Sequence, residues 1–125
     1  MEKKKVLIVD DEKTFCELAK INLEATGEFI VQTVSDSRQT IAAVRSFVPH
    51  MILLDLIMPH IGGMEVLEML NSDEVSSRIP VVILSALEKD TDKLRAYKLG
   101  VVGYLVKPAQ TTDIIQAIHK ALEFK

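Results

Sequence analysis

Residues 6–12 read VLIVDDE, four apolar residues that run directly into three acidic ones. Three of the four are β-branched, and a short run of this kind is typical of a strand covered on both faces of a sheet. Asp10 and Asp11 would stand where that strand ends. The stretch therefore predicts a buried strand with carboxylates at its carboxyl end.

Further runs of strand length follow, and segments with helical spacing separate them. Gln32 and Thr33 interrupt one run, which we therefore expect at an edge of the sheet. Helical spacing is clear around residues 41–48 and 114–121, and strict alternation of strand and helix predicts an α/β fold with a parallel sheet. The strand-length runs are residues 6–9, 29–34, 51–54, 81–84 and 102–106.

Several polar residues and glycines mark where helices begin and end. Asp36 followed by Gln39 predicts a capping box at the start of the second helix, and Gly100 suits the left-handed position that closes the fourth. Gly62 and Gly63 suit a tight turn into the third helix in which φ is positive.

The composition predicts one soluble domain over residues 1–125. Hydrophobic residues make up 48% of the chain and charged residues 26%, which is ordinary globular usage. The net charge of −3 does not suggest a surface for nucleic acid, so we expect no direct nucleic-acid partner, and residues 3–5 (KKK) are expected to be a solvated flank. A single cysteine, Cys16, and the lack of an apolar stretch of about 20 residues favour a cytoplasmic protein without a membrane segment.

Five polar residues follow the predicted strands. Asp10 and Asp11 end the first, Asp55 the third and Ser85 the fourth, and Lys107 follows the fifth. Ligands of open α/β sheets bind at the carboxyl ends of strands. Taken one at a time, the aspartates could cap a helix or begin a turn and the lysine could be a surface residue, but all five at strand ends favour a site.

The same residues suggest phosphoryl chemistry. If the first and third strands are neighbours, three carboxylates lie close together, and they repel one another unless a cation compensates them. An all-oxygen donor set suits Mg²⁺. A carboxylate beside Mg²⁺, with Lys107 and the Ser85 hydroxyl aimed at the same place, can accept a phosphoryl group as an acyl phosphate, and Asp55 is the central candidate.

At this point a family resemblance is clear. Residues 6–12 (VLIVDDE), residues 53–59 (LLDLIMP), Gly63, Ser85 with Ala86, and Lys107 with Pro108 resemble the signature of response-regulator receiver domains of two-component systems, over the whole chain. The resemblance implies a flavodoxin-like, doubly wound fold: a single five-stranded parallel sheet in the order 2-1-3-4-5 with five flanking helices.

The resemblance also implies the ligands of the Mg²⁺ ion. Asp11 would bind the metal directly, and Asp10 would often act through water. Asp55 would be both ligand and phosphoacceptor, and the backbone carbonyl of Ile57 would complete the protein's share of the coordination.

Further roles follow from the same resemblance. Ser85 and Lys107 would each contact a phosphoryl oxygen after transfer, and the bond from Lys107 to Pro108 would be cis. Ser85 and Tyr104 would form the switch, with Tyr104 moving inward. A histidine kinase or histidine phosphotransfer protein would donate the phosphoryl group. A surface of the fourth helix, fifth strand and fifth helix would then signal to a downstream protein effector or output domain.

Such a chain would be a signalling switch and not an enzyme, catalysing only its own phosphorylation and dephosphorylation. A haloacid-dehalogenase-type phosphatase needs a second aspartate where this chain has Ile57, and an FMN carrier would find its phosphate repelled by residues 10–12. One alternative stays open, a non-phosphorylated receiver-like interaction module. Ile57 and Leu87, each two positions after a site residue, would offer no hydrogen bond to a hydrolytic water and so predict a long-lived phosphorylated state.

Overall fold

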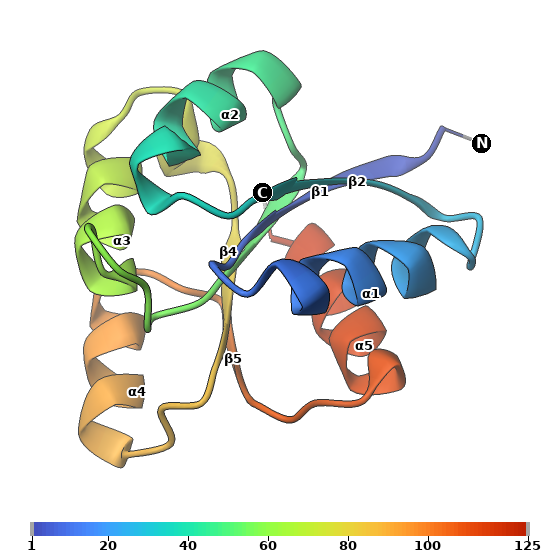
Figure 1. Ribbon diagram of the computed structural model, residues 1–125. Helices are drawn as coiled ribbons and strands as arrows, with labels where there is room; N and C mark the ends of the chain where they lie inside the picture. The colour runs from blue at the N-terminus through green and yellow to red at the C-terminus, as the bar shows by residue number, and fades with distance from the viewer. Residues whose placement is uncertain (1, 125) are drawn as a thin grey trace.

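The computed structural model describes residues 2–124, in which strands and helices alternate and the strands form one parallel sheet (Figure 1). The strand order is β2-β1-β3-β4-β5. This confirms the predicted doubly wound fold, with the strand that contains Gln32 and Thr33 at an edge. The elements are β1 (Lys4–Val9), α1 (Lys13–Glu24), β2 (Phe29–Val34), η1 (Ser37–Gln39), α2 (Thr40–Phe47), β3 (Met51–Leu54), α3 (Gly63–Ser72), η2 (Ser76–Arg78), β4 (Val81–Ser85), α4 (Asp90–Lys98), β5 (Gly103–Val106) and α5 (Thr111–Leu122).

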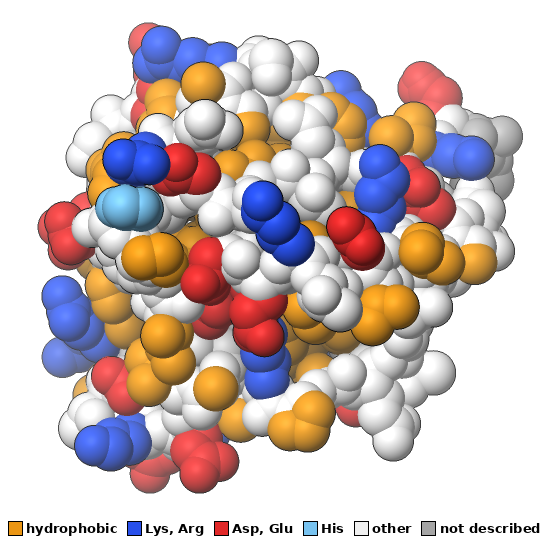
Figure 2. Space-filling model, viewed as in Figure 1, with side chains coloured by type: hydrophobic (Ala, Val, Ile, Leu, Met, Phe, Trp, Pro, Cys, Tyr) orange, Lys and Arg blue, Asp and Glu red, His pale blue; other side chains and the backbone are white. Residues whose placement is uncertain are grey.

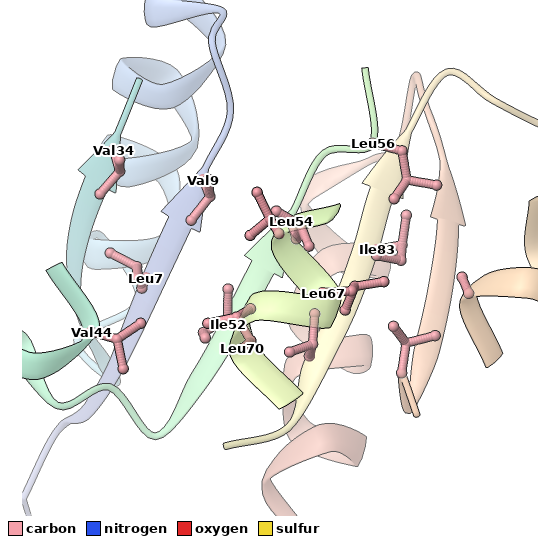
Figure 3. Packing of buried hydrophobic residues seen from close by; sticks show 14 of the residues in the cluster. Leu7, Val9, Val34, Val44, Ile52, Leu54, Leu56, Leu67, Leu70 and Ile83 are labelled. Carbon is pink, nitrogen blue, oxygen red and sulfur yellow. The ribbon is translucent and has the colours of Figure 1, made fainter. Parts of the chain in front are cut away.

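Two hydrophobic layers enclose the sheet. Helices α2, α3 and α4 cover one face and α1 and α5 the other, as Figure 1 shows. In β1, Leu7 and Val9 point to the first layer, while Val6 and Ile8 point to the second. Figure 3 shows the first layer, where Leu7 and Ile52 of neighbouring strands lie near helical side chains. Because both faces are covered, the central strands are apolar throughout.

Two features of the amino-terminal half differ from expectation. The predicted capping box at the second helix is wrong, because Asp36 caps the 3-10 turn η1 by accepting from the Arg38 N–H at 3.0 Å, and α2 begins only at Thr40. The lysine run is not a free flank either. Lys5 belongs to β1, and its ammonium donates to the Phe47 carbonyl oxygen at 2.8 Å.

Glycines close to the third and fourth helices have different roles. Gly100 has φ +95° just after α4, which confirms its left-handed position. The predicted positive φ at Gly62 and Gly63 is wrong; Gly62 has φ −72°, and His60 takes the left-handed conformation with φ 69°. Gly63 is required for another reason, since a Cβ there would overlap the backbone of Asp55 and of its neighbour Leu56.

No helix among residues 2–124 is long and apolar enough to cross a membrane.

Candidate phosphoacceptor and cation site

Backbone pairing of β1 with β3 brings the acidic residues together. Val9 is in parallel register with Leu54, and the Asp55 N–H donates to the Val9 carbonyl oxygen at 3.0 Å. The strands therefore end side by side, and Asp10 and Asp55 follow them with 1% and 5% of their surface exposed. Asp10, Asp11 and Asp55 each offer a carboxylate oxygen, and these oxygens lie within 4.8 Å of one another.

An open cavity of about 230 Å³ lies over this cluster. Figure 2 shows acidic side chains gathered near the middle of the molecular face that is turned toward the viewer, with hydrophobic side chains bordering them. The Ile57 side chain is 51% exposed at the cavity, and the Ile57 N–H donates to Asp55 Oδ1 at 3.2 Å. The lining residues are Asp11, Glu12, Asp55, Ile57, Ala86 and Lys107.

Lys107 is the cation that faces this cluster. Its Nζ lies 2.5 Å from Asp10 Oδ2, 3.1 Å from Glu12 Oε1 and 3.7 Å from Asp55 Oδ2. The bond to Pro108 is cis, and the Lys107 N–H donates to the Ser85 carbonyl oxygen at 2.8 Å, which ties the loop after β5 to the end of β4.

The pKa shifts of Asp10 and Lys107 reflect their burial and their pairing with each other. Burial raises the pKa of Asp10, and the charge of Asp55 adds to this, although hydrogen bonds from Lys107 and from the Glu12 N–H oppose it. Burial disfavours the charged form of Lys107, but its hydrogen bond to Asp10 and the charges of Asp10 and Asp55 outweigh that and raise its pKa. Lys107 therefore stays charged at neutral pH, while burial disfavours the ionised form of Asp10.

Ser85 and Tyr104 meet at the backbone of Leu87. Ser85 is fully buried, and its hydroxyl accepts from the Leu87 N–H at 3.3 Å. The Tyr104 hydroxyl donates to the Leu87 carbonyl oxygen at 2.6 Å. One residue thus connects the predicted hydroxyl position with the predicted switch tyrosine. The Leu87 side chain packs against the core, so it differs from Ile57, which lines the cavity.

Two contacts of Lys107 were not predicted. Glu12 and Phe15 lie one turn apart at the start of α1, and the ammonium of Lys107 lies 4.3 Å from the centre of the Phe15 ring. Glu12 is the N-cap of α1 and has an extended backbone, so helical spacing does not pair it with Phe15. Their shared partner lies more than 90 residues away in the sequence, and nothing local points to it.

Fold and site together define a doubly wound α/β protein with an acidic, lysine-paired site at the carboxyl rim of its sheet. The family model described as the response regulator receiver domain matches residues 6–119, and the chain belongs to this family, whose members serve two-component signalling.

Curated relatives agree with this family. The chain is 33% identical over 118 residues to the DNA-binding dual master transcriptional regulator RpaA of Synechocystis sp., covering 94% of this chain and 48% of the relative. It is 31% identical over 111 residues to the alkaline phosphatase synthesis transcriptional regulatory protein PhoP of Bacillus subtilis, covering 89% and 45%. The chain thus spans about half the length of these relatives. Their names give no support to the expectation that nucleic acid is not a partner.

Solved structures share the fold. A putative response regulator from Chloroflexus aurantiacus superposes with a TM-score of 0.89 at 20% identity, covering 98% of this chain and 99% of the other. The chemotaxis protein CheY4 of Vibrio cholerae gives a TM-score of 0.89 at 23% identity, with 96% and 99% covered.

Proposed function

We propose that the chain accepts a phosphoryl group on Asp55 in a Mg²⁺-dependent reaction, from a histidine kinase or a histidine phosphotransfer protein. The observation that carries this proposal is a combination of three properties. Among residues 2–124, Asp55 is the one carboxylate that belongs to the acidic cluster, lines the cavity and lies within 4.0 Å of Lys107 Nζ. Asp10, Asp11 and Glu12 each lack one of the three.

The donor set fits Mg²⁺. Asp10, Asp11 and Asp55 supply carboxylate oxygens only, which suit a hard cation, and the raised pKa of Asp10 marks a position where added positive charge is favourable. With the Ile57 backbone carbonyl, these residues would hold the ion. Bound there, Mg²⁺ would neutralise charge on the phosphoryl oxygens.

The residues of the chain would then divide the work. An Asp55 carboxylate oxygen forms a bond to phosphorus as the bond from phosphorus to the donor nitrogen breaks. Lys107, charged at neutral pH, pairs with a phosphoryl oxygen, and the Ser85 hydroxyl contacts another. Positioning and charge compensation of this kind account for most catalysis of phosphoryl transfer.

The switch would run through the contacts at Leu87. If the Ser85 hydroxyl turns toward the phosphoryl group, it no longer accepts from the Leu87 N–H, and the Leu87 backbone that accepts from Tyr104 is held less firmly. Helix α4 is suited to respond, because Ala96 is its one buried residue and Leu94 is 57% exposed. Phosphorylation would shift a pre-existing equilibrium at the α4, β5 and α5 surface, where a protein effector or output domain would bind.

The test is labelling with a small phosphodonor, acetyl phosphate, in the presence of Mg²⁺. The Asp55→Asn variant should take up no label, whereas Asp90→Asn, which changes an aspartate at the start of α4, should label normally. Full labelling of Asp55→Asn would refute the assignment. A wild-type chain that neither labels nor responds to Mg²⁺ would favour the interaction module.

A further inference from the structure

One buried hydroxyl, from a segment that does not line the cavity, is hydrogen-bonded to the loop after Asp55. Ser37 is 2% exposed, and its Oγ donates to the Pro59 carbonyl oxygen at 3.2 Å and accepts from the Ile61 N–H at 3.3 Å. These two partners flank His60, the loop residue with φ 69°. The bridge therefore closes the turn around a residue whose backbone conformation is uncommon outside glycine.

Ser37 is itself held in place by its neighbours. The Thr40 hydroxyl, which is fully buried, donates to the Ser37 carbonyl oxygen at 2.8 Å. Asp36 caps the same turn through the Arg38 N–H. The hydroxyl thus projects from a fixed point between β2 and α2, and the loop after β3 is attached to that point.

The held loop carries part of the phosphoacceptor site. At its start, the Ile57 N–H donates to the Asp55 carboxylate, and at its end the Gly63 N–H donates to the Leu56 carbonyl oxygen at 3.0 Å. The Ser37 bridge fastens the segment between these two bonds. Without it, the Pro59 carbonyl and the Ile61 N–H would lose their hydrogen-bond partner, and only the packing of the Ile61 side chain against the first layer would hold this part of the loop, so the Ile57 backbone would be less restricted.

We propose that Ser37 is a positioning residue for the phosphoacceptor loop, whose hydroxyl sets the Ile57 backbone in the geometry that cation binding needs. This inference rests on the proposed function. It assigns to η1, which contributes no residue to the cavity lining, a part in the chemistry at Asp55.

The experiment compares two buried serines. Ser37→Ala removes the bridge, whereas Ser76→Ala removes a hydroxyl that is 1% exposed and donates to Asp73 Oδ2 at 2.8 Å in the η2 turn. Mg²⁺ binding is measured by calorimetry without phosphodonor, and labelling by acetyl phosphate is measured across Mg²⁺ concentrations. Ser37→Ala loses both hydrogen bonds of the bridge, and Mg²⁺ binding should weaken by about the free energy of one ordinary hydrogen bond, which is about 3- to 10-fold. Ser76→Ala should bind as wild type, and Ser37→Thr, which keeps the hydroxyl, should recover most of the affinity.

A second measurement needs no variant. In the metal-free wild type, the Ile61 amide should be protected from hydrogen exchange, because its N–H is bonded to a buried oxygen. Exchange at the unprotected rate would overturn the inference, as would wild-type Mg²⁺ affinity in Ser37→Ala or equal losses in both alanine variants. Absence of Mg²⁺ binding in the wild type would instead refute the proposed function, so the two failures are distinguishable.

Discussion

Gly63→Ala should damage the fold and the site together, while the same change one residue earlier should be tolerated. At Gly63 the added methyl would overlap backbone atoms of Asp55 and Leu56, and neither the end of β3 nor the start of α3 can move away cheaply. Overpacking of this kind typically costs 1–3 kcal/mol, and contact with backbone places the expected loss near the upper end, at about 3 kcal/mol. For a domain of this size, that lowers the melting temperature by about 12 °C.

Gly62→Ala is the matched control. Its φ of −72° suits any residue, and an added Cβ would lie 3.9 Å from the Leu56 carbonyl oxygen, an ordinary contact. Alanine reduces the freedom of the unfolded chain but is a poorer helix N-cap than glycine, so the two effects oppose and stability should stay within about 1 kcal/mol of wild type.

Urea unfolding followed by circular dichroism measures both variants, and calorimetry measures their Mg²⁺ binding. Gly63→Ala should lose stability and Mg²⁺ affinity, because the displaced backbone carries Asp55. If the two variants are equally stable, or if Gly62→Ala is the weaker, the steric reasoning is wrong.

Three further predictions test other parts of the structure. Ile57→Asn should speed loss of phosphate from Asp55 by about tenfold or more, since a polar group at the cavity can orient water. Leu87 is partly buried against the core, so Leu87→Asn should chiefly lower stability, and autodephosphorylation rates and urea unfolding separate the two variants. Hydrogen bonds from Arg38 lower the pKa of Asp36 to about 2. They therefore stabilise the folded state above the unfolded pKa of Asp36, about 4, and this stabilisation is lost as pH falls toward 2. Arg38→Gln should raise the pH at which acid unfolds half of the protein, and an unchanged midpoint would contradict this. Val48 ends α2 with φ 50°, so Val48→Gly should gain about 1 kcal/mol in urea unfolding, and a loss would show that the conformation is not strained.

The central strands were predictable because a strand covered on both faces must be apolar throughout. The same rule misses Lys4 and Lys5, because a lysine at the end of a strand can pair its backbone while its long side chain brings the ammonium to a polar partner, as Lys5 does at the Phe47 carbonyl. At the site, strand ends identify Asp10, Asp55 and Lys107, since parallel strands finish at one rim. Strand order, which makes β1 and β3 neighbours, came only from the family resemblance.

What the sequence could not show depends on close contacts between distant segments. The role of Gly63 is set by the backbone of Asp55 and Leu56 beside it, and a glycine after a proline-containing turn is as well explained by positive φ. Ser37 has no local feature that sets it apart from any other serine. Its two partners become visible only when the loop after β3 folds against η1.

Without metal, the acidic cluster should make the protein less stable than a variant that lacks one of the clustered charges. Asp10 is 1% exposed, and its pKa in the folded protein is raised chiefly by burial. Its ionised form therefore disfavours folding at neutral pH. This free-energy cost is lost as pH falls through the raised pKa toward the unfolded value. Asp10→Asn removes the charge but keeps the shape, and Lys107 retains Glu12 and Asp55 as partners. The variant should therefore be more stable than wild type without metal, as measured by urea unfolding in a chelating buffer.

With Mg²⁺ bound, the wild type should instead be more stable than Asp10→Asn. A ligand present at ten times its dissociation constant stabilises the folded state by about 1.4 kcal/mol, and the wild type should gain this amount on titration. Asp10→Asn should gain much less, because one of the three clustered carboxylates is neutral, while Asp90→Asn should respond as wild type. A metal-free Asp10→Asn that is less stable than wild type would show that the ion pair with Lys107 outweighs the cost of burial. An undiminished response to Mg²⁺ would show that Asp10 takes no part in holding the ion.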